Sequence, residues 1–217
     1  MLFGNASVAQ LLASVLALLV AFTFHEASHA LVAYRLGDDT AKRLGRLTLN
    51  PLAHLDPLGT LMIFVASFGW GKPVPVNPYR LRHPGGRLGM GLVSAAGPVA
   101  NLLLGWAFAA PFRAGLIHTI APISLFIPSL GQVLYTIVIL NVFLAVFNLL
   151  PIPPLDGFKV AIALLPQQTA YSLSRFEQYG PLLLLGLVLF VPYLFRVDLL
   201  GALMHPLANV FLGLFLR

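Results

Sequence analysis

His25, Glu26 and His29 form an H-E-x-x-H pattern near the N-terminus of the chain. On a helix, two histidines four residues apart point to one face, so both imidazoles can bind one metal ion. Glu26 lies beside them and can take a proton from a metal-bound water. The surrounding segment is apolar, and ionisable residues within an apolar membrane helix are functional by default because they are costly there. The pattern favours a metal-dependent hydrolytic site over a polar helix face that only packs against other polar groups.

A catalytic zinc site usually has three protein ligands and a water, so the two histidines need a third partner. The chain has no cysteine, which leaves histidine, aspartate or glutamate. Asp156 is the best candidate, because it follows a long apolar segment and the three prolines between Asn148 and Gly157. Prolines end a helix and allow the carboxylate to turn back into a bundle. Taken alone, an Asp-Gly pair is most often only a turn.

The composition indicates a membrane protein. Of the 217 residues, 59% are hydrophobic and only 9% are charged, against about 25% charged in an ordinary soluble domain. Much of the surface must therefore face the lipid bilayer. The net charge of +6 comes without a basic run or a basic stripe with interleaved aromatic residues, so no nucleic-acid partner is expected. No basic side chain precedes the first apolar run, which favours a retained membrane helix over a cleaved signal peptide.

The apolar segments predict a polytopic α-helical membrane protein with about five transmembrane helices. Leu58–Trp70 is short for a full span and is expected to be re-entrant or to lie on the surface. Arg43–Leu49 and Lys72–Pro78 are expected to form small β-strands or loops near the membrane surface. Without a repeat or a second module, residues 1–217 are expected to form a single integral-membrane domain. The five predicted spans are Val8–Leu36, Leu88–Phe112, Leu130–Leu150, Pro181–Phe195 and Leu199–Leu216.

The H-E-x-x-H pattern and a second motif after a later helix together resemble the site-2 protease family of intramembrane zinc metalloproteases. The Gly97–Asn101 stretch is similar to a further feature of that family. The chain resembles the minimal prokaryotic form, without a PDZ domain, so nothing about substrate gating in the PDZ-bearing members carries over. The residues of the second motif are Asn148, Pro151, Asp156 and Gly157.

The resemblance implies a zinc metalloendopeptidase with one Zn²⁺ per chain, bound by His25, His29 and Asp156. It implies that Glu26 is the general base, which activates a zinc-bound water, and that Asn148 hydrogen-bonds the substrate or the oxyanion. The implied reaction is regulated intramembrane proteolysis, in which transmembrane segments of membrane-bound substrates are cut within the bilayer. The implied location is the plasma membrane of a prokaryotic cell.

Other interpretations remain open for several polar residues. Asn148 could instead make an interhelical hydrogen bond, and Asn101 and Asn141 are expected to be packing contacts. His54 is expected to belong to a turn. Glu177 could be the third ligand of a different class of membrane protease, although no supporting pattern surrounds it. A non-enzymatic membrane metal or proton transporter is the alternative outside the proteases, but it would place ionisable residues along successive helices.

The topology follows from the metal site and from the basic residues. His29 and Asp156 can share one ion only if an even number of crossings separates them. In that arrangement only Arg113 and Arg196 lie on the other side of the membrane from the active site. The positive-inside rule therefore predicts that the active-site side faces the cytoplasm. The eleven basic residues expected on the active-site side are Arg35, Lys42, Arg43, Arg46, Lys72, Arg80, Arg82, Arg87, Lys159, Arg175 and Arg217.

Overall fold

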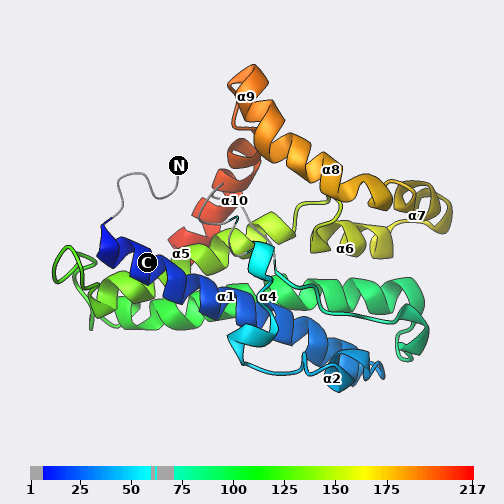
Figure 1. The fold of residues 1–217 in the computed structure, drawn as a ribbon, viewed down its shortest axis with the longest axis horizontal. Helices are drawn as coiled ribbons and strands as arrows, with labels where there is room; N and C mark the ends of the chain where they lie inside the picture. The colour runs from blue at the N-terminus through cyan, green and yellow to red at the C-terminus, as the bar shows by residue number, and fades with distance from the viewer. Residues whose placement is uncertain (1–6, 60–61, 63–70) are drawn as a thin grey trace.

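Three long helices form the centre of the molecule in the computed structural model, which describes residues 7–59, 62 and 71–217. They are α1 (Val8–Arg35), α4 (Gly86–Arg113) and α5 (Leu130–Asn148). The three helices lie side by side along the long axis, and α4 runs opposite to α1 and α5 (Figure 1). This arrangement brings the end of α1, the beginning of α4 and the end of α5 to the same end of the bundle.

The sequence explains why α1 packs so closely against its neighbours. Ser7 caps the helix by accepting a hydrogen bond from the backbone N–H of Gln10 at 3.2 Å. Fully buried alanines then follow every fourth residue along one face of the helix, and small residues at this spacing let helix backbones approach each other in a membrane. These alanines are Ala9, Ala13, Ala17 and Ala21.

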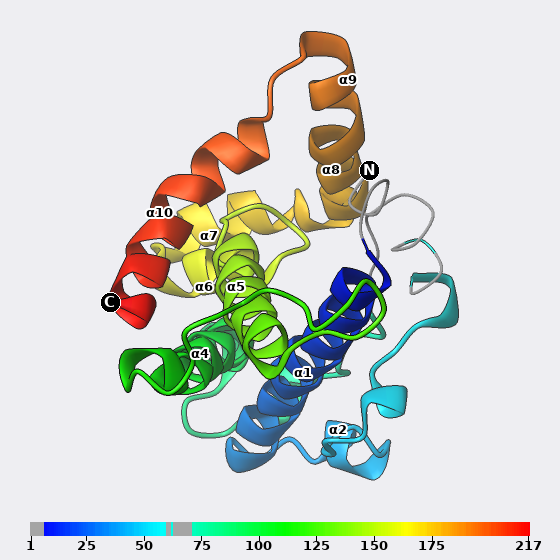
Figure 2. The ribbon, with the colours of Figure 1, turned by 90° about the vertical axis from the view of Figure 1, so that its left-hand side faces the viewer.

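The C-terminal part of the chain adds a second group of helices beside this bundle. α6 (Asp156–Leu164) packs on α4, and α8 (Gly180–Leu185) leads away from the bundle toward a turn from which α10 (Leu199–Leu216) returns (Figures 1 and 2). The elements between them are α7 (Gln167–Ser174), η3 (Glu177–Tyr179), the π-helical turn η4 (Gly186–Phe190) and α9 (Val191–Phe195).

The prediction of a polytopic helical membrane protein is confirmed. Within the described residues, five helical segments are long and apolar enough to cross a bilayer: α1, α4, α5, Gln167–Phe195 and Leu199–Leu216. Only 11% of the apolar window of each of the last two is buried inside the molecule. Most of their apolar surface is therefore available to lipid.

The expected small β-strands are not formed by the residues that the structure describes. Arg43 ends a short helix, α2 (Thr40–Arg43), and turns and bends follow it. The backbone N–H of Lys72 donates to the carbonyl of His54 at 2.9 Å, but residues 73–77 form no strand, since Pro73 and Pro75 have no N–H to donate to a ladder. A single bridge joins Leu55 to Gly71. The short 3₁₀ turns η1 (Pro51–Ala53) and η2 (Pro78–Arg80) complete this region.

The expected re-entrant or surface-lying segment, Leu58–Trp70, lies almost entirely outside the described residues. The C-terminus departs from the expected topology. A guanidinium N–H of Arg113, at the end of α4, donates a hydrogen bond to the carbonyl of Phe215 at 3.2 Å. Arg217 therefore lies near Arg113, rather than with the basic residues of the active-site end where it was expected. The reason is that the last turn of α10 packs on α4, where Phe215 belongs to one apolar cluster with Ala109.

Candidate metal centre

His25, His29 and Asp156 meet at the end of the bundle where α1, α4 and α6 converge. One carboxylate oxygen of Asp156, Oδ2, lies 3.1 Å from Nε2 of His25 and 3.2 Å from Nε2 of His29. The two Nε2 atoms are 3.0 Å apart. Both histidines are buried, and the side chain of Asp156 is 17% exposed. Among the residues described, this is the one group of three or more histidines and acids whose ligand atoms all lie within 4.8 Å of one another.

Asp156 reaches the histidines because the chain reverses sharply after α5. Asp156 is the first residue of α6, and Gly157 packs directly against the backbone of Leu149 and Leu150, just after the end of α5. A Cβ atom on Gly157 would lie 2.2 Å from the carbonyl oxygen of Leu149. The glycine of the Asp-Gly pair is therefore required by this close approach, and the pair is more than a surface turn.

The donor atoms fit a zinc ion. Zinc binds histidine nitrogen and carboxylate oxygen at about 2.0–2.2 Å, so the donors of a tetrahedral site are about 3.3 Å apart. The three observed separations are close to that value. Nδ1 of His29 lies 2.7 Å from the carbonyl oxygen of Val93, which can only accept a hydrogen bond. The proton is thus on Nδ1, and Nε2 presents its lone pair to the centre of the group.

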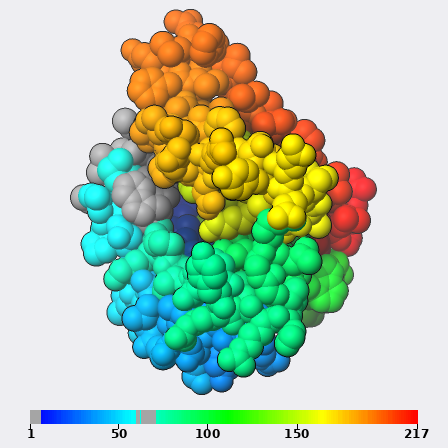
Figure 3. Space-filling model, turned by 90° about the vertical axis from the view of Figure 1, so that its right-hand side faces the viewer, coloured from blue at the N-terminus to red at the C-terminus, as the bar shows by residue number. Residues whose placement is uncertain are grey.

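A cavity of about 330 Å³ opens beside this group. Glu26, which is 9% exposed, lines it together with Asn148. Asn148 donates to the carbonyl of Leu144 on its own helix at 3.0 Å, so this bond does not join two helices. The face of the molecule seen in Figure 3 is hollowed, and dark blue atoms of α1 are visible at the floor of the hollow. The remaining lining residues include Pro73, Val74, Val76, Ser94 and Lys159.

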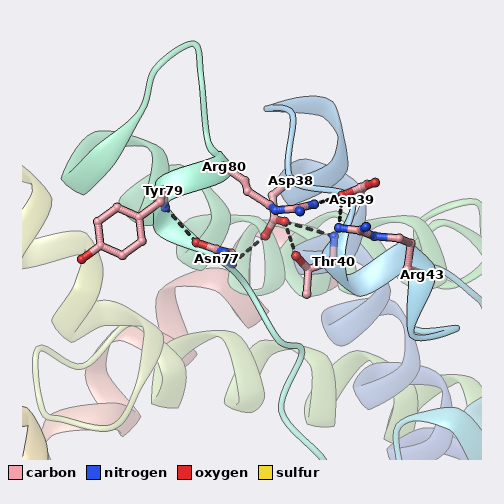
Figure 4. Close-up of polar contacts among 7 residues, drawn as sticks. All are labelled: Asp38, Asp39, Thr40, Arg43, Asn77, Tyr79 and Arg80. Atoms are coloured by element: carbon pink, nitrogen blue, oxygen red, sulfur yellow. Dashed lines mark hydrogen bonds and ion pairs between the residues drawn. The ribbon is translucent and has the colours of Figure 1, made fainter.

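One wall of the cavity, the extended segment of residues 73–77, is held by Asp38 in the connection between α1 and α2 (Figure 4). The buried carboxylate of Asp38 accepts a hydrogen bond from the backbone N–H of Asn77 at 2.6 Å. It also accepts from the backbone N–H and the hydroxyl of Thr40 at 3.0 and 2.5 Å. Burial raises the pKa of Asp38, but the hydrogen bonds from Thr40 and Asn77 outweigh burial and hold the pKa below its ordinary value.

Asn101 and Gly97 lie at the site, although neither was predicted from the sequence to belong there. Asn101 lies 2.6 Å from Nδ1 of His25, a contact that residue spacing along a single helix cannot predict. Gly97, one turn before Asn101, brings the backbone of α4 against both histidines. His54, by contrast, is fully buried but lies outside the cluster, where its Nε2 donates to the carbonyl of Thr48 at 2.9 Å.

Comparison with known proteins gives the family. The sequence model of peptidase family M50 matches residues 83–191, which are 109 of the 217 residues and include Asn148 and Asp156. "Putative zinc metalloprotease YwhC" of Bacillus subtilis is 48% identical over 179 residues, which are 82% of this chain and 79% of the relative. This chain belongs to peptidase family M50, the site-2 protease family.

More distant relatives agree with this assignment. "Putative zinc metalloprotease Rip2" of Mycolicibacterium smegmatis is 34% identical over 174 residues, which are 79% of this chain and 64% of the relative. The protein of the same name from Mycobacterium tuberculosis (strain H37Rv) is 35% identical over 181 residues, with coverage of 79% and 64%. No solved structure matches the chain. This M50 peptidase is therefore a zinc-dependent metalloprotease with several membrane-spanning helices.

Proposed function

We propose that this M50 peptidase is an intramembrane zinc endopeptidase that cuts transmembrane segments of membrane-bound proteins, with His25, His29 and Asp156 as its zinc ligands. The observation that carries the proposal is the convergence of three ligand atoms, 3.0 to 3.2 Å apart, between apolar helices. The cavity beside them contains Glu26 and Asn148. Polar groups at such a depth are tolerated where they line a cavity that water can enter, and peptide hydrolysis needs that water.

Each polar residue of the cavity has a role in this proposal. Zinc, when bound, supplies Lewis acidity that polarises the scissile carbonyl and lowers the pKa of a water toward 7. Glu26 accepts a proton from the attacking water and delivers it to the nitrogen of the leaving amine. Asn148 keeps one N–H on Leu144, which leaves its second N–H and its carbonyl oxygen for the substrate backbone. The amide of Asn148 can thus orient the scissile peptide or stabilise its oxyanion.

The substrate must be unwound where it is cut. Amide groups inside a helix are already hydrogen-bonded to each other, so a transmembrane helix must open locally before a peptide bond can be attacked. Val74 and Val76 line the cavity beside the proposed ligands, and unlike the neighbouring prolines they keep backbone N–H groups that can pair with an extended chain. We expect the cut to fall in a transmembrane segment that unwinds easily.

We propose that the protein works in a prokaryotic plasma membrane with the site toward the cytoplasm. The support is the distribution of basic residues, ten of which lie in the stretch from the last residue of α1 to the first turn of α4 or between α5 and α8. Loops on the cytoplasmic side of membrane proteins carry such an excess of lysine and arginine.

The test replaces the proposed general base without altering the proposed ligands. Glu26→Gln should retain zinc after purification but abolish cleavage. The substrate would be found as a membrane protein that accumulates uncleaved in cells carrying Glu26→Gln, and the cut would be mapped by mass spectrometry of its fragments from wild-type cells. Asp156→Ala, measured in parallel, should lose zinc and activity together, whereas the exposed carboxylate variant Asp39→Ala should lose neither.

Two results would contradict the proposal. Cuts mapped only outside transmembrane segments would exclude intramembrane proteolysis while leaving a metalloprotease. Zinc or proton flux through purified protein in vesicles, unaffected by Glu26→Gln and without any cleavage product, would favour the transporter instead.

A further inference from the structure

Asn101, on α4, hydrogen-bonds both the proposed zinc ligand His25 on α1 and Asn141 on α5. Its side chain is fully buried in α4. Its Oδ1 lies 2.6 Å from Nδ1 of His25, and its Nδ2 lies 2.8 Å from both the carbonyl oxygen of Ala21 and Oδ1 of Asn141. Asn141 is also fully buried, and its own Nδ2 lies 2.9 Å from the carbonyl oxygen of Ile137. The contacts of Asn101 with α1 and α5 cross between apolar helices, whereas that of Asn141 with Ile137 stays within α5, and an unmade hydrogen bond among such buried groups is costly.

Backbone carbonyls set the direction of every hydrogen bond in this group. A carbonyl oxygen can only accept, so the NH₂ group of Asn101 must face Ala21, and that of Asn141 must face Ile137. The oxygen of Asn141 then accepts from Asn101, and the oxygen of Asn101 faces His25. Because that oxygen can only accept, Nδ1 of His25 must be the donor.

The consequence for His25 is a single tautomer. With the proton on Nδ1, Nε2 presents a lone pair, and Nε2 is the atom that lies 3.1 Å from Asp156 and 3.0 Å from His29. His29 is fixed in the same tautomer by the backbone carbonyl of Val93, which no side-chain substitution removes. His25 depends on a side chain, so its orientation can be altered by mutation.

We infer that Asn101 is a positioning residue, which holds His25 as the Nδ1–H tautomer with Nε2 directed at the zinc, and that Asn141 holds the amide of Asn101 in the required direction. The inference rests on the proposed function in taking His25 as a ligand. It replaces the expectation from sequence that both asparagines are packing contacts. A hydrogen-bonded partner on the outer nitrogen of a ligating histidine fixes its tautomer and ring orientation, and loss of such a partner lowers metal affinity by about 10–100-fold.

The experiment compares three variants of the full chain purified in detergent. Asn101→Ala removes the acceptor for His25. Asn101→Asp keeps an acceptor oxygen for His25 but loses the donors to Ala21 and Asn141, so it damages packing and keeps the positioning contact. Gln132→Ala is the matched control, because Gln132 is a buried amide on α5 that hydrogen-bonds Gln10 on α1 at 2.8 Å and touches neither histidine.

Two quantities are measured for each variant. Zinc affinity is obtained by competition with a chelator of known affinity. The tautomer of His25 is obtained without zinc, from the nitrogen chemical shifts of ¹⁵N-histidine-labelled protein, with the His25 signal assigned by its loss in His25→Ala. We expect Asn101→Ala to weaken zinc binding by about 10–100-fold and to populate the other tautomer. Asn101→Asp should keep the Nδ1–H tautomer and most of the affinity despite a lower melting temperature, and Gln132→Ala should change neither readout.

Unchanged affinity and tautomer in Asn101→Ala would overturn the inference. So would an Asn101→Asp variant that loses as much affinity as Asn101→Ala, since packing alone would then explain both. If Asn101→Ala cannot be purified, Asn101→Asp decides alone, and a loss of about tenfold or more in its zinc affinity would overturn the inference. Zinc binding that survives in the His25→Ala variant would instead refute the proposed ligands, and the zinc-free tautomer measurement on the other variants would still test the contact with Asn101.

Discussion

At the scale of single residues, Gly97 is where α4 comes closest to the histidines of α1. A Cβ atom at this position would lie 2.4 Å from Nε2 of His29 and 2.6 Å from Cε1 of His25. Both are atoms of the proposed zinc site, and neither ring can move away without losing its hydrogen bond to Val93 or Asn101. Helix propensity alone predicts that Gly97→Ala would stabilise the protein, because alanine is favoured over glycine in a helix by about 1 kcal/mol.

We therefore expect Gly97→Ala to weaken zinc binding by at least about tenfold, the lower end of the effect of disturbing a ligand's support. The control is Gly213→Ala on α10, where a Cβ would meet nothing within 4 Å. That variant should bind zinc like the wild type and unfold at an equal or higher temperature. Zinc titration and thermal unfolding check both variants, and Gly97→Ala with full zinc affinity would show that the helices can separate here at little cost.

The residues of the site differ in how far sequence alone could predict them. His25 and His29 share one helix, so their spacing already predicts a common face. Asp156 could be proposed only because the pair needed a third ligand. Asn101 and Gly97 act across the interface between α1 and α4, and their positions depend on the register of one helix against the other. No spacing along a single segment contains that register.

At the scale of elements, the extended residues 73–77 were expected to be a strand or a loop, and the structure explains why they are neither paired nor free. Prolines remove the N–H groups that a ladder would need. The segment is held instead by the carboxylate of Asp38, one oxygen of which accepts from Asn77 while the other accepts twice from Thr40 (Figure 4). A loop held in this way can serve as a fixed wall of the cavity.

Asp38→Asn tests this connection. An amide presents an oxygen on one side only, so it can accept from Thr40 or from Asn77 but not from both. A buried donor that loses its partner costs about 1–3 kcal/mol, and we expect a loss of stability in that range near neutral pH. The exposed neighbour Asp39, which pairs with Arg43 and Arg80, is the control, because Asp39→Asn should cost at most about 1 kcal/mol.

The difference in stability between wild type and Asp38→Asn should depend on pH with a definite sign. The pKa of Asp38 is lowered in the folded protein, so its contribution is fully present above the ordinary value of 3.8 and is lost as the pH falls through the lowered native value. Thermal unfolding of wild type and Asp38→Asn should therefore differ at pH 7, begin to converge below about pH 4, and agree once the pH is below the lowered native pKa. A difference that persists unchanged in acid would mean that the lost stability does not come from the carboxylate.

At the scale of the whole molecule, the two chain ends bear on how many segments cross the bilayer. The beginning of α1 lies at the Arg113 end of the bundle, where the backbone N–H of Ala9 donates to the carbonyl of Leu125 at 3.0 Å. The last turn of α10 lies at that end too, through the contact between Arg113 and Phe215. With Arg217 moved to this side, ten basic residues lie with the active site or in the segments adjoining it, and Arg113, Arg196 and Arg217 lie apart from it. The direction given by the positive-inside rule is unchanged.

This arrangement predicts that the beginning of α1 and the C-terminus are on the same, outer side of the membrane. Termini on one side require an even number of complete crossings, so one of the two exposed C-terminal segments, Gln167–Phe195 or Leu199–Leu216, would enter the bilayer without crossing it. The chain has no native cysteine, which makes single-cysteine labelling with a membrane-impermeant reagent in intact cells direct. Cysteines at positions 82 and 168 should be protected, while those at positions 118 and 217 should be labelled. Labelling at 118 with protection at 217 would instead mean that α10 ends in the cytoplasm and that its contact with Arg113 is not kept in the bilayer.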